Sequence, residues 1–186
     1  MKMKHLAFVW TSGDFRGVED MNRYWIPVTL ALAIAVNGSL LPSLFPGAVM
    51  PDLVLVIVVI AALTKPKGYS VTAAFVSGII QDLLSGQFVG LNTGLNMLLA
   101  AMIGEFGGSL FRENLFTPFA IILASTFSKQ LIYLVVIYAF GLRFGLALPT
   151  LYVVLLTGLL NAVIGSVIYK FVYLRRVDHY NRNLNV

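Results

Sequence analysis

Long apolar runs separated by short polar links extend over most of the chain. The apolar centre of one run, LVLVIVVIAAL at residues 53–63, has no polar residue at any second position. A strand of an outer-membrane barrel would alternate polar and apolar residues, so this pattern excludes a barrel. The run lengths instead favour helices that cross the ~30 Å hydrocarbon core of a bilayer. The pattern predicts six transmembrane helices at residues 24–45, 49–64, 68–84, 88–111, 117–140 and 148–173.

The second and third predicted spans differ from the others. A helix over residues 49–64 covers roughly 24 Å, slightly less than the ~30 Å hydrocarbon thickness, so we expect it to lie among the other helices. The third span is the least apolar and should face protein rather than lipid. Its polar residues are Ser70, Thr72, Ser77, Gln81 and Asp82.

Composition supports an all-α integral membrane protein. Of the 186 residues, 59% are hydrophobic and only 11% are charged, whereas soluble domains carry about 25% charged residues. The mean hydropathy is +0.87. These values exclude a soluble enzyme, a nucleic-acid-binding domain, a disordered chain and a coiled coil. The absence of cysteine excludes disulfides and cysteine metal sites.

The basic residues predict the orientation of the chain. Eleven of them lie on one side of the six predicted spans, Arg143 alone lies on the other, and Lys129 lies within a span. Because cytoplasmic links are rich in Lys and Arg, both termini are expected on the cytoplasmic side of the membrane. The eleven are Lys2, Lys4, Arg16, Arg23, Lys65, Lys67, Arg112, Lys170, Arg175, Arg176 and Arg182.

Three regions are expected along the chain. Residues 1–20 form an N-terminal extension without a periodic apolar face, interpreted as a flexible arm or a mis-assigned start, with a short interfacial helix as the alternative. Residues 21–175 form one transmembrane helical domain. Residues 176–186 form a short cytoplasmic tail.

Residues for catalysis or for cofactor binding are not found within the spans. Both histidines, His5 and His179, lie in the tails, so we expect no catalytic site, metal site or cofactor. Gly86, Gly90 and Gly94 recur every four residues but lack the Lys-Ser/Thr ending of a phosphate-binding loop. We interpret Gly86 as the end of the third span, and the other two as places where a helix approaches closely.

Four ionisable residues lie in or at the ends of the spans, where a charge costs about 2.5–3.5 kcal/mol on insertion scales. Asp52 begins the second span and is expected to complement the positive end of that helix. Asp82 ends the third span, where it either binds a partner or caps the following turn. The remaining two are Glu105 and Lys129.

Lys129 lies about 18 Å into the fifth span, near the middle of the membrane. Glu105 is expected roughly 9 Å below it by the same helical rise. The main hypothesis is therefore an ion pair between Glu105 and Lys129 that ties two helices together. A partner helix that contacts Lys129 is one alternative. A proton relay is another, although no embedded histidine or chain of carboxylates continues the path.

Residues 51–94 resemble the MreD family of rod shape-determining proteins. The matching features are Pro-x-x-x-Leu at 51–55, a short basic link at 65–67, and a small-residue face on the third span. The most specific string is Asp-Leu-Leu-Ser-Gly-x-x-x-Gly-Leu-Asn at 82–92. Motifs cover about a quarter of the chain, while length, span count and the basic tail agree over the rest.

The resemblance implies a non-enzymatic scaffold of the bacterial elongation machinery, the elongasome. Such a protein would bind MreC and, through it, the MreB filament and the synthase formed by RodA and a class B penicillin-binding protein. It would thereby help organise lateral peptidoglycan synthesis and rod shape. The implied fold is similar to the substrate-binding component of energy-coupling-factor transporters. No family role is carried over to Lys129.

A vitamin-binding component of such a transporter is the alternative function. Ala31 and Ala35 have the Ala-x-x-x-Ala spacing that those components use to contact their transporter module. A vitamin binder also needs a roofed pocket with aromatic and charged groups. The predicted outer links at 46–51 and 85–87 are too short to cover such a pocket. Co-purification with MreC or with an ATPase module would separate the two functions.

Overall fold

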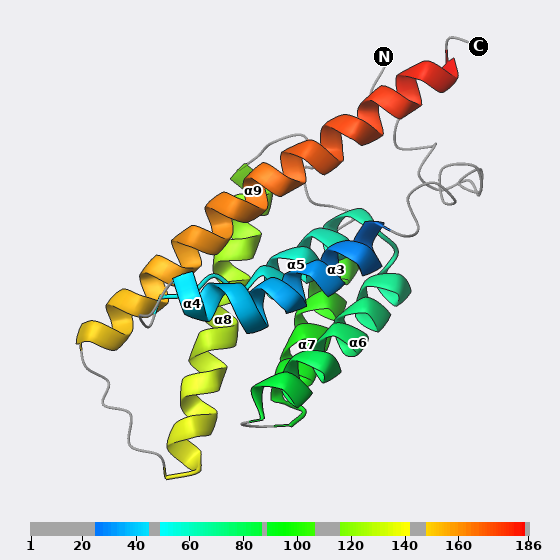
Figure 1. Ribbon diagram of the computed structural model, residues 1–186. Helices are drawn as coiled ribbons and strands as arrows, with labels where there is room; N and C mark the ends of the chain where they lie inside the picture. Colours follow the sequence, from blue (N-terminus) through cyan, green and yellow to red (C-terminus); the bar gives the residue numbers. More distant parts are fainter. Residues whose placement is uncertain (1–24, 45–48, 87–88, 107–115, 142–147, 185–186) are drawn as a thin grey trace.

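The computed structural model describes residues 25–44, 49–86, 89–106, 116–141 and 148–184, and every regular element in these ranges is helical (Figure 1). Residues 1–20, the predicted extension, lie outside the described ranges. The elements are α3 (Trp25–Ala35), the π-helix η1 (Val36–Leu40), α4 (Leu41–Leu44), α5 (Leu53–Thr64), α6 (Lys67–Ser85), α7 (Leu91–Phe106), α8 (Phe116–Ala139) and α9 (Leu148–Leu184).

The first three elements follow one another without a break, so the described residues form six helical segments at the six predicted positions. Three segments are long and apolar enough to cross a membrane: Trp25–Leu44, Phe116–Ala139 and Thr150–Phe171. α5 is a shorter apolar helix. The all-helical class is confirmed, whereas six crossings and the transporter-like fold stay predictions. α9 continues beyond the predicted end of the last span, to Leu184.

α5 is the centre of the bundle. Every residue from Val54 to Thr64 is buried, and α5 contacts α3, α6, α7, α8 and α9. Because its apolar side chains point in every direction, the helix is suited to burial all round rather than on one face. The expectation that the short second span lies among the other helices is therefore confirmed.

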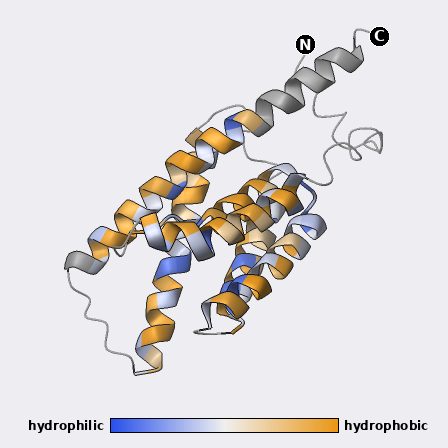
Figure 2. Ribbon diagram, viewed as in Figure 1, coloured by the Kyte–Doolittle hydropathy of each residue, from blue (hydrophilic) through white to orange (hydrophobic). Residues whose placement is uncertain are grey.

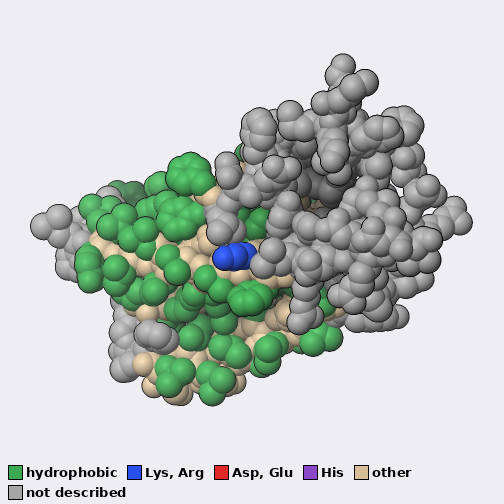
Figure 3. Space-filling view, turned by 90° about the horizontal axis from the view of Figure 1, so that it is seen from above, with side chains coloured by type: hydrophobic (Ala, Val, Ile, Leu, Met, Phe, Trp, Pro, Cys, Tyr) green, Lys and Arg blue, Asp and Glu red, His purple; other side chains and the backbone are tan. Residues whose placement is uncertain are grey.

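The outer helices form two closely packed pairs, α6 with α7 and α8 with α9 (Figure 1). Apolar residues dominate these helices, and hydrophilic residues interrupt α8 near its middle and the α6–α7 pair (Figure 2). Hydrophobic side chains cover most of the described part of the face in Figure 3. This surface matches the hydrocarbon core of a bilayer.

α6 turns its polar face toward the protein, as predicted for the third span. Ser70, Ser77, Gly78 and Asp82 are buried along one stripe of the helix, whereas Thr72 is exposed. α6 lies close to the backbone of α7 at Gly78, where an added Cβ would lie 2.5 Å from the Cα of Thr93. A glycine is therefore required at this crossing.

The close approach expected at two other glycines is not found among the residues that the structure describes. At Gly90 and Gly94 an added Cβ would meet nothing within 4 Å. Gly90 instead has φ +96°, a backbone conformation that L side chains rarely adopt. Approach of a partner's helix to this surface stays a proposal.

Gly78→Ala should loosen the α6–α7 pair. Its Cβ would force the Thr93 backbone to move, and such overpacking costs about 1–3 kcal/mol. Gly94→Ala is the matched control, because this helical glycine faces open space and alanine favours a helix by about 1 kcal/mol over glycine. Thermal unfolding in detergent should show a lower Tm for Gly78→Ala alone. Equal Tm values for the two variants would contradict this packing.

Candidate functional site

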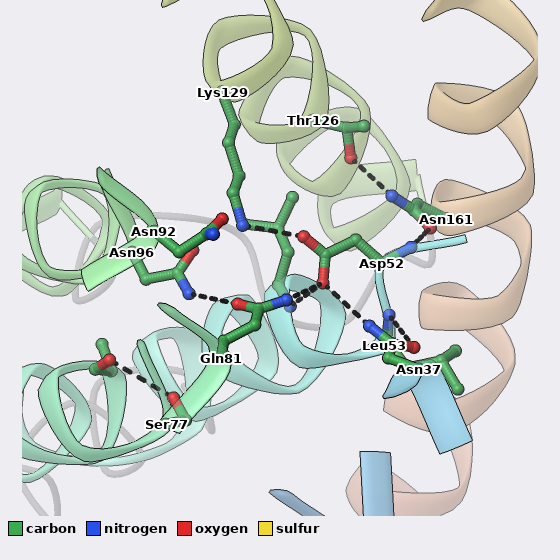
Figure 4. Close-up of polar contacts among 12 residues, drawn as sticks. Asn37, Asp52, Leu53, Ser77, Gln81, Asn92, Asn96, Thr126, Lys129 and Asn161 are labelled. Atoms are coloured by element: carbon green, nitrogen blue, oxygen red, sulfur yellow. Dashed lines mark hydrogen bonds and ion pairs between the residues drawn. The ribbon is translucent and has the colours of Figure 1, made fainter. Parts of the chain in front are cut away.

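A buried ion pair joins Asp52 to Lys129 (Figure 4). The Lys129 Nζ lies 2.7 Å from the Asp52 Oδ2, and the two side chains are 8% and 23% exposed, in that order. Lys129 lies near the middle of the 24-residue α8, and Asp52 immediately precedes α5. A charge at this depth is tolerated only when it is paired, so each residue depends on the other.

The Asp52 carboxylate accepts three further hydrogen bonds, all at Oδ1. The backbone N–H of Leu55 donates at 3.1 Å, which makes Asp52 the N-cap of α5. The side-chain amides of Asn37 in η1 and Gln81 in α6 each donate at 3.3 Å. The predicted complement to the positive end of the helix is therefore present, and it carries two amide contacts that the sequence did not reveal.

Asn161 connects α9 to the same centre. This fully buried side chain accepts the backbone N–H of Asp52 at its Oδ1, at 2.9 Å, and donates from its Nδ2 to the Thr126 Oγ1 of α8, at 3.2 Å. Thr126 in turn donates to the Ile122 carbonyl at 2.8 Å. Three segments of the bundle, α5, α8 and α9, are thereby held at one level.

Asn96 extends the polar centre to α7. Its Nδ2 donates to the Gln81 Oε1 at 3.4 Å, and its side chain is fully buried. Five helical segments, together with the N-cap residue of the sixth, α5, therefore contribute side chains to one hydrogen-bonded network, the Asp52 network. Its members are Asn37, Asp52, Gln81, Asn96, Thr126, Lys129 and Asn161.

The expected Glu105–Lys129 pair does not form. Lys129 bonds to Asp52, and Glu105 bonds instead to Lys67 at the start of α6. The prediction used the rise per residue, which gives the depth of Glu105 and Lys129 along their helices. It does not give the direction in which either side chain points around its helix. The Lys67–Glu105 pair has both side chains at least half exposed, so it is held far less firmly than the buried pair.

Asp82 caps α7 from the end of α6. Its carboxylate accepts the backbone N–H groups of Gly90, Asn92 and Thr93, each at 3.0 Å, and the Thr93 hydroxyl at 2.6 Å. The side chain is fully buried. Of the two roles left open for Asp82, the geometry shows the cap. Four donors also compensate a carboxylate that sits at the unfavourable C-terminal end of its own helix.

The structure thus explains the sequence motif at residues 82–92. Asp82 supplies the cap, and Gly86 ends α6 in the left-handed conformation with φ +65°, its N–H donating to the Asp82 carbonyl at 3.1 Å. Gly90 provides the second left-handed turn residue, directly before α7. The tight reversal between α6 and α7 requires all three residues.

Comparison with known protein families adds one match. The family described as rod shape-determining protein MreD matches residues 20–175. The chain belongs to the MreD family. Its members take part in rod shape determination, and the matched region includes every residue of the Asp52 network and the α6–α7 turn. No curated protein and no solved structure matches the chain.

Sequence reasoning missed three amides of this MreD-family chain. Each of Asn37, Asn96 and Asn161 lies within a predicted membrane span, which is the signal that could have revealed them. Buried amides in a membrane require partners because water is absent from the hydrocarbon core. An asparagine within such a span therefore indicates contact with another polar side chain, although not which one.

Removing one member of the Asp52–Lys129 pair should cost more than removing both. Lys129→Met and Asp52→Asn each leave one buried charge unpaired, at a cost of about 3–5 kcal/mol. The double variant has no charge to compensate, and an amide at position 52 can still cap α5. Because the double variant should cost less than either single variant, unfolding in mixed SDS micelles should give a coupling free energy of at least about 3 kcal/mol.

The exposed Lys67–Glu105 pair provides the control for this cycle. Lys67→Met and Glu105→Gln should show almost no coupling, because both side chains reach solvent. Additive losses at positions 52 and 129 would show that the buried pair does not exist in the membrane protein.

Asp82→Leu should destabilise the chain more than Asp82→Asn. Leucine leaves the N–H groups of Gly90, Asn92 and Thr93 without an acceptor, a loss of at least about 2 kcal/mol. Asparagine retains one oxygen, which at the Oδ2 position still accepts the N–H groups of Gly90 and Thr93. Amide hydrogen exchange at residues 90–93 should accelerate strongly with leucine and slightly with asparagine. Similar exchange in both variants would argue against the cap.

Proposed function

We propose that this chain is a non-enzymatic membrane scaffold that binds MreC and helps organise lateral peptidoglycan synthesis in rod-shaped cells. In this proposal the chain crosses the bacterial inner membrane six times, with both termini in the cytoplasm. Through MreC it reaches the MreB filament and the synthase of RodA and a class B penicillin-binding protein. Membership of the MreD family and the apolar helices support this assignment.

The scaffold proposal is supported mainly by the contacts that the acidic side chains make. The structure describes three acidic side chains, and each is bonded to a group on another helix: Asp52 to Lys129, Asp82 to the start of α7, and Glu105 to Lys67. A general acid or base must instead face a substrate. The described acidic side chains therefore favour a role in holding the helices in place over a role in catalysis.

The apolar outer surface supports partner binding within the membrane. Exposed large side chains include Leu83, Val135, Leu151 and Phe171, on three different helices. A bitopic partner such as MreC has a membrane helix that can pack on such a surface, where van der Waals contact drives association. The Asp52 network would keep this surface in one shape, so that the partner meets a fixed template.

Two observations favour the transporter alternative. Ala31 and Ala35 are both exposed on α3, as contact with a transporter module would require. A cavity of about 380 Å³ also borders Asp52. This cavity, the Asp52 recess, is lined by Ile34, Asn37, Gly38, Leu41, Met50, Pro51, Asp52, Gln81, Leu84 and Ser85. Among the described residues, the lining includes no aromatic side chain, which a vitamin site is expected to have.

Affinity purification from the membrane tests the two functions together. The tagged full-length chain should retain MreC and restore rod shape to cells that lack their own copy of the family protein. Lys129→Met should retain several-fold less MreC at an equal membrane level, because the bundle loses its central bond. Lys67→Met, which removes an exposed lysine, should behave as the unchanged chain.

Retention of an ATPase module without MreC would establish the transporter alternative instead. Failure to retain either partner, with the chain present at normal level in the membrane, would contradict the scaffold proposal.

A further inference from the structure

The Asp52 recess exists because α5 is short. Its 12 residues cover roughly 18 Å, so a helix that starts at Asp52 cannot fill the ~30 Å hydrocarbon layer. Asp52 is bonded to Lys129 near the middle of α8, which fixes that starting point deep in the bundle. The space before α5 lies between η1 and the end of α6, and the recess occupies it.

The π-helix η1 shapes one wall of the recess. The wider turn at Val36–Leu40 places Asn37 against Asp52 (Figure 4) and leaves open space at Gly38, where an added Cβ would meet nothing within 4 Å. Insertions of this kind are rare and are often found at functional sites. The irregular turn is therefore a second feature, besides the volume of the cavity, that points to this place.

The lining of the recess combines a polar floor with apolar walls. Asn37, Asp52 and Gln81 form the floor, and the walls include Ile34 and Leu84. The volume of about 380 Å³ falls within the range of roughly 300–1,000 Å³ that is typical of small-molecule sites. A ligand that fits must therefore have a polar end and an apolar body.

The floor favours an uncharged polar group. The charge of Asp52 is compensated by Lys129, so a charged ligand would lose its hydration without meeting a counter-charge. The amide nitrogens of Asn37 and Gln81 each carry a second N–H besides the one donated to Asp52. A hydroxyl or a carbonyl oxygen can accept from these amides.

We propose that the Asp52 recess binds a small neutral amphiphile. A hydroxyl- or carbonyl-bearing end lies at Asn37 and Gln81, and a short alkyl chain lies along Ile34, Leu41 and Leu84. The site binds its ligand without chemical change and without MreC. The ligand joins η1 to the end of α6, so its binding tightens the end of the bundle where α5 begins.

Cysteine labelling of the full-length purified chain tests the site, because the native chain has no cysteine. Leu84→Cys reports from the recess and Leu83→Cys is the matched control: the native leucines are 65% and 69% exposed, but only Leu84 lines the cavity. The probe is 1-octanoylglycerol, which has two hydroxyls, a carbonyl and a short chain. At about twice its dissociation constant it should slow maleimide labelling of Leu84→Cys about threefold.

Labelling of Leu83→Cys should stay unchanged, and neither octanoate nor octylammonium should protect position 84. Gly38→Leu, combined with Leu84→Cys, should abolish protection by filling the recess. Gly94→Leu, at a glycine that also faces open space but lies outside the recess, should leave protection intact.

Three results would overturn the proposal: no protection by 1-octanoylglycerol, equal protection at positions 83 and 84, or full protection in the Gly38→Leu variant. Equal or better protection by a charged probe would refute the assigned ligand chemistry. Because the assay uses the purified chain alone, none of these results bears on retention of MreC.

Discussion

The buried ion pair between Asp52 and Lys129 determines how the helices of this chain are arranged. An ammonium group near the middle of a membrane helix needs a counter-charge, and Asp52 is the one it meets. Because Asp52 is also the N-cap of α5, the pair fixes the depth at which the central helix starts. The amides of Asn37, Gln81 and Asn161 then gather around the same carboxylate and its backbone. A buried ion pair by itself adds little net stability to a fold. A hydrogen-bonded network that joins all six segments instead favours one arrangement of the helices over other arrangements with similar apolar packing.

The carboxylates of Asp52 and Asp82 have the same structural role. Asp52 and Asp82 each accept the free N–H groups at the start of a helix while linking that helix to another one. The positive end of the helix stabilises the carboxylate. The carboxylate in turn accepts hydrogen bonds from backbone N–H groups that lipid could not satisfy. These bonds therefore join neighbouring helices within the bundle. The recess next to Asp52 is a direct consequence of where the central helix starts.

Much of this architecture could be predicted from the sequence. Apolar runs marked the six segments, the polar stripe of α6 indicated a face toward protein, and Gly86 after Asp82 indicated a helix end. The partner of Lys129 could not be predicted, because helical rise gives depth but not the direction in which a side chain faces its neighbours. Glu105 was the nearer carboxylate by that measure, yet it faces Lys67. The recess was missed because it depends on a π-turn at Asn37 and Gly38, which apolar periodicity does not reveal.

Solid-state NMR in lipid bilayers measures the central bond most directly. With Asp labelled at the ¹³C carboxyl carbon and Lys at the ¹⁵N ammonium, the Nζ–Oδ2 distance of 2.7 Å predicts strong dipolar dephasing of one Asp signal. Glu105, the carboxylate of the other described ion pair, carries no label. The dephasing should vanish in Lys129→Met and persist in Lys67→Met. Absence of this contact in the unchanged chain, or its survival in Lys129→Met, would contradict the account.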